Sequence, residues 1–588
     1  MKNVYIKYSL IILAGISILT GGIFFAIRHH NADERTEIAV KPDVPNLPVT
    51  NILQSNKDNS NKMIQDSDDL EKVNINEFLH DHLANRYHCD AQNWYDIVNN
   101  NYKNVTVLEN NTFQYDYGVN HQNGKIILRA KNRKTTEWLV EQYIKYLSYT
   151  DTCINTSDLP PSVVNFEKSE DKDFDFTYRE PHFSPNLKAK YDPYYGANSV
   201  EEYWDLWGHN LYKELKIYKK QQVICFSDET FFNNVVKYLE SKSRTLHTGR
   251  FMIMPMDVMS ACTCSKCREL GNSANYATPA LMNMLDRLAE KFSKIETLPK
   301  YSFYTAAYHS TQLPPKTPPK YRTAGLILST SDLPKGVALD TKNVSVVDFM
   351  ETIQAWKDYT DELLVWDYAA NFNDYLTPLP ILYVLKKNLK FFRDCGITGI
   401  FLQGGSYDYS TFDDVKTFAA MALMIDNRLD VDDLCTRFFK QYYPVSAQLL
   451  INYYLSLEKA MEAREQEYDM HGNLDNAIKS YFSVSNFLVF YQNLETFIKE
   501  KKMGDHERKQ LEKLYSALSF TRLQIALYQQ TLSYDISKTH GKTIKITPEI
   551  ETAIKWLSKH SQYNFDNYKE RDGNLNKYLD FWGKYTKK

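Results

Sequence analysis

Polar side chains follow a series of short apolar runs in the central part of the chain, and carboxylates and aromatic rings predominate among them. They are Glu180, His209, Asn210, Asp228, Glu229, Asp257, Tyr308, His309, Asp367, Asn371, Gln403 and Asp408. Paired carboxylates with aromatic walls suit glycoside hydrolysis, in which one acid protonates the leaving oxygen. The second carboxylate then stabilises or attacks the anomeric carbon, or orients a substrate acetamido group that does so. This region has no Ser or Cys beside a recognisable base motif, and Gly404–Gly405 is too short a motif to cradle a phosphate.

Three carboxylates are the candidate catalytic residues. Asp257 ends the apolar run FMIMPM, so its side chain is expected at the mouth of the fold, with a loop cap as the alternative. Asp367 follows Trp366, whose ring could form a sugar platform, or it hydrogen-bonds the strand-to-loop turn. Glu180 lies beside Arg179, so a structural ion pair is its alternative role. The candidate substrate-binding residues are His209, Asn210, Tyr308, Trp366 and Gln403.

Three of the eight cysteines fall in the motif CTCSKC, as Cys262, Cys264 and Cys267. This spacing is similar to a metal knuckle, but a structural zinc ion needs four ligands and no fourth is adjacent. His309 or a distant cysteine could complete the set, and a disulfide within the loop is an equal alternative. We interpret the motif as a clamp on a loop beside the active face. The predicted glycosidase chemistry requires neither a metal ion nor a cofactor.

Eight apolar or aromatic runs alternate with helical segments over residues 170–427. The predicted strands are 174–180, 204–210, 222–228, 251–257, 301–309, 324–331, 363–372 and 397–405. Strands alternating with helices indicate parallel pairing, and eight such units in about 250 residues predict a TIM (β/α)8 barrel. An open, doubly wound sheet is the alternative. In a barrel the candidate residues would meet at the carboxyl ends of the strands.

The flanking regions predict two further domains in this α/β protein. Residues 74–169 combine a predicted strand at 124–130 with a predicted helix at 135–147, which indicates a small α/β domain. After residue 428 apolar residues recur at three- and four-residue steps, so residues 428–588 are predicted to form a helical C-terminal domain. Most of the 43 Tyr residues are expected to pack between these elements.

The N-terminal segment predicts the cellular location. Tyr8 to Ile27 is an uncharged, apolar stretch long enough to cross a bilayer, and we interpret residues 1–27 as an uncleaved signal-anchor helix. Residues 28–73 are rich in Asn, Asp, Ser and Pro and are predicted to be a disordered tether. The folded part would then face the periplasm or the cell exterior, with secretion after signal-peptide cleavage as the alternative. The net charge of −3 argues against nucleic acid as a partner.

Several of these segments together resemble the domain of unknown function 4838 family. They are GHN at 208–210, QVICFSDE at 222–229, MPMD with CTCSKC at 255–267, WDYAANF at 366–372 and GITGIFLQGG at 396–405. That family is similar to α-glucuronidase-like TIM-barrel glycosidases, and some members are placed in glycoside hydrolase family 163, whose enzymes are retaining endo-β-N-acetylglucosaminidases that act on N-glycans. The resemblance implies a glycan-processing hydrolase and matches Asp257 and the three motif cysteines to family positions.

The leading hypothesis is therefore a membrane-anchored glycoside hydrolase for glycans that contain β-linked N-acetylhexosamine. Asp257 would be the general acid or would orient the acetamido group, with Asp367 or Glu180 as its partner. A non-catalytic glycan-binding or cell-surface protein that retains the barrel is the alternative. A third hypothesis is a zinc-dependent hydrolase that uses the cysteine motif.

Overall fold

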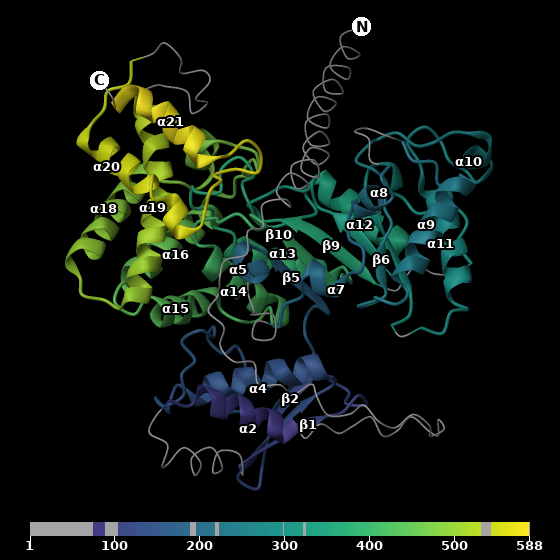
Figure 1. Cartoon of the computed structure of the whole chain (residues 1–588), viewed down its shortest axis with the longest axis horizontal. Coiled ribbons are helices and arrows are strands. Elements are labelled where there is room, and N and C mark those ends of the chain that lie inside the picture. Colours follow the sequence, from purple (N-terminus) through teal and green to yellow (C-terminus); the bar gives the residue numbers. More distant parts are fainter. Residues whose placement is uncertain are drawn as a thin grey trace.

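The computed structural model describes residues 75–88, 104–188, 196–217, 223–297, 299–320, 325–360, 362–530 and 543–586. The predicted signal-anchor helix (Tyr8 to Ile27) and the predicted tether (28–73) lie outside the described residues. Among the helices that the structure does describe, none combines the length and apolar character that a membrane span requires. Figure 1 shows a small N-terminal α/β region below a central sheet, with a group of C-terminal helices beside that sheet.

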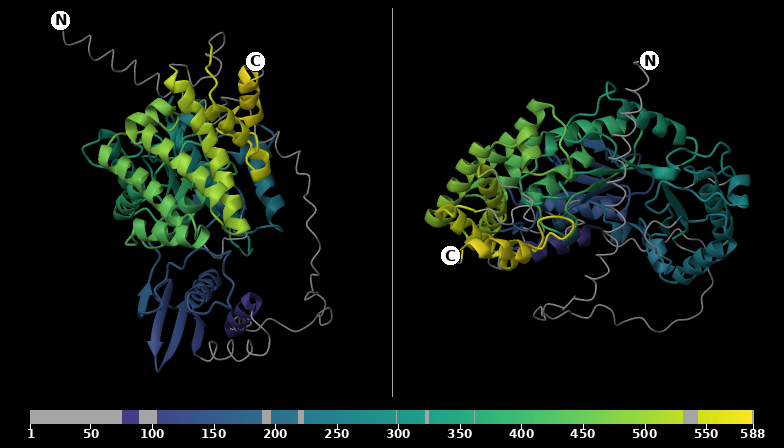
Figure 2. Two further views of the ribbon diagram at one scale, coloured as in Figure 1. Left: turned by 90° about the vertical axis from the view of Figure 1, so that its left-hand side faces the viewer. Right: turned by 90° about the horizontal axis from the view of Figure 1, so that it is seen from above.

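The N-terminal region is a four-stranded sheet covered by two helices. The strands are β1 (Val105–Glu109), β2 (Tyr117–Gln122), β3 (Lys125–Ala130) and β4 (Glu170–Lys172), in the order β1-β3-β2-β4. Asn123 and Gly124 both have positive φ and join β2 to β3 in a tight hairpin. Helices α2 (Ile75–Arg86) and α4 (Arg133–Leu147) cover the sheet (Figures 1 and 2). The predicted strand at 124–130 and helix at 135–147 are confirmed as β3 and α4.

The central sheet has six strands that all pair in parallel. They are β5 (Tyr178–His182), β6 (Arg250–Met252), β7 (Ser302–Ala307), β8 (Gly325–Ser329), β9 (Leu363–Tyr368) and β10 (Gly399–Gln403), in the order β5-β10-β9-β8-β7-β6. The main helices between them are α9 (Glu229–Lys242), α11 (Thr278–Phe292), α12 (Val344–Trp356) and α13 (Leu382–Asp394), and α14 (Asp413–Ile425) follows β10. This pattern of parallel strands and helices confirms the predicted α/β class.

The prediction of a closed, eight-stranded barrel is wrong in its strand count and closure. Of the segment 204–210, only Leu206 pairs, through one parallel bridge to Phe251. The described part of the segment 222–228 is no strand, because the backbone N–H of Asp228 bonds back to Cys225 O and the Asp228 side chain caps α9. Among the described residues no backbone pairing joins β5 to Leu206, so the hydrogen-bonded sheet stays open there.

The sheet nevertheless curls into part of a barrel. Trp204, from the segment just before Leu206, donates its indole N–H to Tyr178 Oη on β5 (3.3 Å). The same indole packs against Tyr304 on β7, with ring centroids 4.6 Å apart. Since β5 is one edge strand and β7 lies near the other edge, one side chain touches both ends of the sheet. The concave inner face is therefore enclosed by aromatic side chains.

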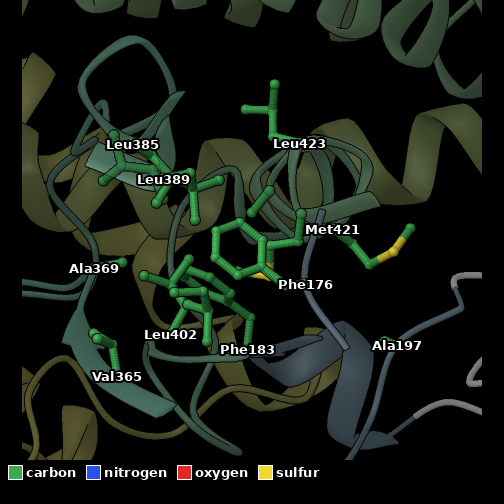
Figure 3. Packing of buried hydrophobic residues seen from close by; sticks show 14 of the residues in the cluster. Phe176, Phe183, Ala197, Val365, Ala369, Leu385, Leu389, Leu402, Met421 and Leu423 are labelled. Atoms are coloured by element: carbon green, nitrogen blue, oxygen red, sulfur yellow. The ribbon is translucent and has the colours of Figure 1, made fainter. Parts of the chain in front are cut away.

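The outer face of the sheet packs against helices. Side chains on a strand alternate between the two faces, so on β9 Leu364 and Trp366 point inward while Val365 points outward. Figure 3 shows outward residues Val365 and Leu402 among Leu385, Leu389 and other apolar side chains of the surrounding helices. Both faces of these strands are thus covered, as expected for a parallel sheet.

The C-terminal part is helical throughout its described residues after β10. Following α14, its helices are α15 (Val431–Tyr442), α16 (Ala447–Arg464), α17 (Leu474–Ser480), α18 (Val484–Glu500), α19 (Asp505–Gln529), α20 (Pro548–Leu557) and α21 (Leu575–Thr586). They lie on the opposite side of the central sheet from α9 and α11 (Figure 2). Connections between these helices hold the loop after β9: Phe372 N donates to Met470 O (2.7 Å), and Glu570 N donates to Phe372 O (2.9 Å).

Candidate functional site

The strand register sets the levels of the side chains on the inner face. Glu180 on β5 pairs with Phe401 on β10, Phe401 with Trp366 on β9, and Trp366 with Ser329 on β8. One level nearer the carboxyl ends, His182, Gln403 and Tyr368 lie in register. Because all six strands are parallel, their carboxyl ends meet at one edge of the sheet, so these levels form a single polar and aromatic surface.

Asp257 is held at this edge, a few residues after β6. Its Oδ1 accepts a hydrogen bond from Tyr308 Oη (2.6 Å) and lies 3.2 Å from His309 Nε2. The side chain is only 4% exposed, yet its buried Oδ2 has no hydrogen-bond partner among the described residues. One oxygen is thus fixed by the protein while the other keeps its capacity to accept a hydrogen bond.

Burial keeps two side chains near Asp257, those of His209 and Tyr308, in their uncharged forms. Burial lowers the pKa of His209. The charge of Asp257 opposes this shift, whereas the interaction with His309 lowers the pKa further. Burial also raises the pKa of Tyr308, and the neighbouring Asp257 carboxylate raises it further. Tyr308 therefore stays protonated and donates its hydrogen bond. His309 has a φ of 51°, an uncommon backbone conformation for a residue other than glycine.

A pair of tryptophans forms the floor of the inner surface. Trp207 and Trp366 stack with ring centroids 5.3 Å apart, and Phe401 contacts both rings. The indole N–H of Trp366 donates to Gln403 Oε1 (2.7 Å), which fixes the orientation of its ring. Both tryptophans remain partly exposed. A partly exposed, oriented aromatic face suits an amphipathic ligand such as a sugar ring.

Glu180 lies inside the curl of the sheet and is completely buried. Its Oε1 bonds to His182 Nδ1 (2.8 Å) and to the backbone N–H of Val200 (3.2 Å), and its Oε2 accepts from Tyr178 Oη. Burial raises the pKa of Glu180, against the hydrogen bonds from His182 and Tyr178. His182 Nε2 lies 3.2 Å from Ser406 Oγ, so the Glu180–His182 pair points towards the loop after β10.

The alternative role predicted for Glu180, an ion pair with Arg179, is wrong. Arg179 is the next residue along β5, so its side chain leaves the opposite face of the sheet. Its guanidinium donates to Gly196 O and Phe176 O and packs over the ring of Phe174 (4.0 Å).

Asp367 is not part of the inner surface, and its predicted role as catalytic partner of Asp257 is corrected. It follows the inward-facing Trp366, so it points to the outer face, where Thr330 Oγ1 donates to its Oδ1 (2.6 Å). Lys335 Nζ lies 4.0 Å away. Burial lowers the pKa of Lys335, and the charge of Asp367 opposes this. Asp367 lines a small cavity between β9, the loop after β8 and α13, which the sheet separates from the inner surface.

The remaining predicted site residues divide between the inner surface and its surroundings. Tyr308, Trp366 and Gln403 belong to the inner surface through the bonds given above. His209 is buried and interacts electrostatically with Asp257. Asn210 begins the short helix α8 (Asn210–Glu214) and donates its backbone N–H to Trp207 O (3.3 Å).

The sequence reasoning missed four residues of the inner surface: Trp207, His182, Tyr368 and Ser329. Tyr368 Oη lies 3.2 Å from Ser329 Oγ. Burial raises the pKa of Tyr368, the hydrogen bond with Ser329 lowers it, and the charges of Asp257 and Asp367 raise it further. A period-two count would have found two of these residues, since His182 is two residues after Glu180 and Tyr368 two after Trp366.

Four cysteines, rather than three, gather beside the Asp257 loop. The ligand atoms of Cys225, Cys262, Cys264 and Cys267 all lie within 4.8 Å of one another. Cys225 comes from the segment before α9, which was predicted to be a strand. His309, one candidate for the fourth ligand, instead contacts Asp257.

Comparison with known families assigns the chain. Its sequence matches the family described as "Domain of unknown function (DUF4838)" over residues 93–456, a range that contains all six strands of the central sheet. The chain belongs to this family. The resemblance of its motifs to the DUF4838 family is thereby confirmed. No curated protein matches the sequence.

Several solved structures are similar to this DUF4838 protein at low sequence identity. A family 89 glycoside hydrolase from Clostridium perfringens, in complex with its substrate GlcNAc-alpha-1,4-galactose, is 9% identical, with a TM-score of 0.47. The match covers 83% of this chain and 65% of that chain, so the DUF4838 protein spans about two thirds of the length of that enzyme. A GH138 enzyme that targets pectin rhamnogalacturonan II is 8% identical, with a TM-score of 0.36, and the match covers 82% of this chain and 74% of that one.

Proposed function

We propose that this DUF4838 protein is an extracytoplasmic glycoside hydrolase that acts on glycans containing β-linked N-acetylhexosamine. The observation that carries the proposal is the state of Asp257. One of its oxygens is held by Tyr308 and His309, while the buried Oδ2 has no partner among the described residues. A buried acceptor without a partner costs free energy, so its presence on a surface with a tryptophan floor favours a substrate that completes it.

In the proposed reaction, the sugar ring packs on Trp366 and its acetamido N–H donates to Asp257 Oδ2. Tyr308 and His309 prevent the carboxylate from rotating, because both hold Oδ1. The acetamido oxygen, oriented in this way, attacks the anomeric carbon from within the substrate and the configuration is retained. The substrate class and the endo-β-N-acetylglucosaminidase reaction rest on the resemblance to glycoside hydrolase family 163.

The proposed source of the proton for the leaving oxygen is the Glu180–His182 pair. Burial raises the pKa of Glu180, and a raised pKa is the direction that a general-acid role requires of a carboxylic acid. Glu180 itself has no exposed surface, so it acts through His182, whose Nε2 lies at the carboxyl end of the sheet beside Ser406. In this scheme Glu180 is a positioning residue rather than a group that touches the substrate.

The proposed location outside the cytoplasm has two supports. The first is the apolar segment from Tyr8 to Ile27. The second is Cys153, which is disulfide-bonded in the structure, because disulfides persist in oxidising compartments and are rare in the cytosol.

Incubation of the purified chain with a panel of N-glycans and other N-acetylhexosamine glycans tests the proposal. Mass spectrometry should detect a released oligosaccharide, and NMR of the first product formed should show retained configuration at the new reducing end. The Asp257→Asn variant should release product about 10²–10⁴-fold more slowly, the range typical for loss of a group that acts in the reaction. Product formed equally fast by Asp257→Asn would overturn the role of Asp257.

The glycan-binding alternative is favoured by one observation, the complete burial of Glu180 with both of its oxygens engaged. A protein of that kind would bind a glycan of the same panel in a calorimetric titration without releasing product. Saturable binding by the unaltered chain, with no product after prolonged incubation, would establish this function in place of hydrolysis.

A further inference from the structure

The four cysteines join two segments that are far apart in the sequence. Cys225 precedes α9, whereas Cys262, Cys264 and Cys267 lie between β6 and α11, the last of them in the short helix α10 (Ser265–Glu269). All four are free thiols in the structure. Cys267 is completely buried and Cys264 is exposed, so the group lies at the surface with one side turned inward.

The spacing of the sulfur atoms distinguishes a metal site from a pair of disulfides. Cys225 Sγ lies 3.7 Å from both Cys264 Sγ and Cys267 Sγ. Four thiolates around a zinc ion at the usual Zn–S distance form a tetrahedron with edges of about 3.8 Å. A disulfide would instead bring two sulfurs to about 2.0 Å. The observed separations thus correspond to the edges of a tetrahedral thiolate site.

Hydrogen-bond donors surround these sulfur atoms. Ser227 Oγ lies 3.1 Å from Cys267 Sγ and 3.6 Å from Cys264 Sγ. The backbone N–H of Cys264 bonds to the sulfur of Cys262, and that of Cys267 bonds to the sulfur of Cys264. Four thiolates around one divalent ion leave a net negative charge, which such donors stabilise, and outer groups of this kind orient metal ligands.

We propose that Cys225, Cys262, Cys264 and Cys267 bind one zinc ion in a closed, tetrahedral structural site. The four thiols lose their protons to solvent as the ion binds, and no electron is transferred. With four protein ligands the ion has no open position for water or substrate, which distinguishes this site from the catalytic zinc of a hydrolase.

The site fixes the loop that carries Asp257. Cys262 follows Asp257 by five residues, and the loop between them is held elsewhere by Ala261 N bonding to Ala274 O (2.7 Å). A zinc ion adds a link from this loop to the start of α9. Because Asp257 must keep one oxygen against Tyr308 and His309, the ion stabilises the geometry of the inner surface from a distance.

Metal analysis of the full chain, grown with zinc in the medium and without added chelator, tests the proposal directly. We expect one zinc ion per chain by mass spectrometry of the metal. Cys264→Ser, which alters an exposed ligand, should lose the ion, and so should Cys225→Ser. The matched control is Cys395→Ser, a partly buried cysteine on α13's C-terminal end outside the cluster, which should keep one equivalent.

A cobalt spectrum and a thiol count decide the result if a variant fails to fold. After exchange of the unaltered chain into Co²⁺, strong visible absorption bands typical of tetrahedral thiolate coordination support the site. The proposal is overturned if the chain contains no zinc, gives no such bands and shows the four cluster cysteines paired in disulfides by peptide mapping. Stoichiometric zinc in Cys225→Ser also overturns it, because the ion would then lie elsewhere.

Discussion

Asp257, in the loop after β6, and Asp367, near the end of β9, both lie at the carboxyl edge of one sheet, yet their surroundings are opposite. Asp257 keeps one buried oxygen without a partner among the described residues, next to donors on the concave face. Asp367 lies on the convex face, where its Oδ1 accepts a hydrogen bond from Thr330 and lies near the buried Lys335. The difference shows that a place at the end of a strand does not by itself fix the surroundings of a carboxylate. The face to which the side chain points decides which groups it meets.

The sharpest test of this contrast is the pair Asp257→Asn and Asp367→Asn. Loss of a group that acts in the reaction typically costs 10²–10⁴-fold in rate, and we expect a fall of that order in kcat/KM for Asp257→Asn. Asp367→Asn should keep kcat/KM within a few fold, since the sheet separates it from the inner surface. Initial rates on the best glycan of the panel provide the measurement. Equal losses in both variants would show that the two aspartates do not differ in this way.

Stability should show the reverse order. Asp367→Ala removes the acceptor of the 2.6 Å bond from Thr330 Oγ1 and the carboxylate 4.0 Å from the buried Lys335. Lys335 Nζ keeps its bonds to the carbonyls of Thr330 and Leu333, so the free energy of unfolding should fall by about 1–3 kcal/mol. Urea denaturation followed by fluorescence measures this loss. In the double variant with Lys335→Met, the loss should be smaller than the sum of the two single losses, because the buried cation is removed as well. Additive losses would contradict a direct interaction between the two side chains.

The tryptophan floor predicts a smaller effect on substrate affinity. Trp366→Ala removes the proposed sugar platform and should raise KM about tenfold, which corresponds to about 1.4 kcal/mol of binding free energy. Trp366→Phe keeps an aromatic face but loses the bond to Gln403, so its KM should lie between those of the unaltered chain and Trp366→Ala. Trp556→Ala, at a partly exposed tryptophan of α20, is the matched control and should leave KM unchanged.

The least pronounced expected effect is a change in the pH dependence of folding caused by Glu180. Burial holds its pKa above the ordinary value of 4.5, so the folded protein keeps a proton that the unfolded chain loses. The contribution of Glu180 to stability is therefore greatest below pH 4.5 and declines as pH rises through the raised pKa. The slope of this decline for one proton is at most about 1.4 kcal/mol of unfolding free energy per pH unit. Glu180→Gln should not show the decline.

Urea denaturation at a series of pH values compares Glu180→Gln with the unaltered chain. Glu351→Gln, an exposed glutamate on α12, is the control and should follow the unaltered chain at every pH. A free-energy difference between Glu180→Gln and the unaltered chain that stays constant with pH would mean that folding does not shift the pKa of Glu180, which would contradict this prediction.

Some parts of the structure follow from sequence patterns alone. In the N-terminal region the apolar run of β3 and the helical spacing of apolar residues in α4 were enough to predict both elements. The position of Asp257 after FMIMPM likewise predicted that it lies at the carboxyl edge of the sheet. The orientation of Asp367 could not be predicted, because the run LLVWDY is covered on both faces and has no polar alternation to show which side chains point inward. The place of Cys225 beside the other three cysteines could not be predicted for a related reason. The run QVICFSD has the composition of a strand, although the chain turns there and brings the cysteine to the CTCSKC loop.

The loop after β9 depends on residues that lie beyond the region shared with the family. Phe372 bonds to Met470 and Glu570, whereas the family match ends at residue 456. Asn567 likewise holds Asp408, on the loop after β10, at 3.0 Å. The rim of the concave face is thus built by two parts of the chain, and only one of them lies within the family match. Changes in residues 457–588 can therefore reshape this rim while the loop that carries Asp257 and the strand that carries Trp366 remain unaltered.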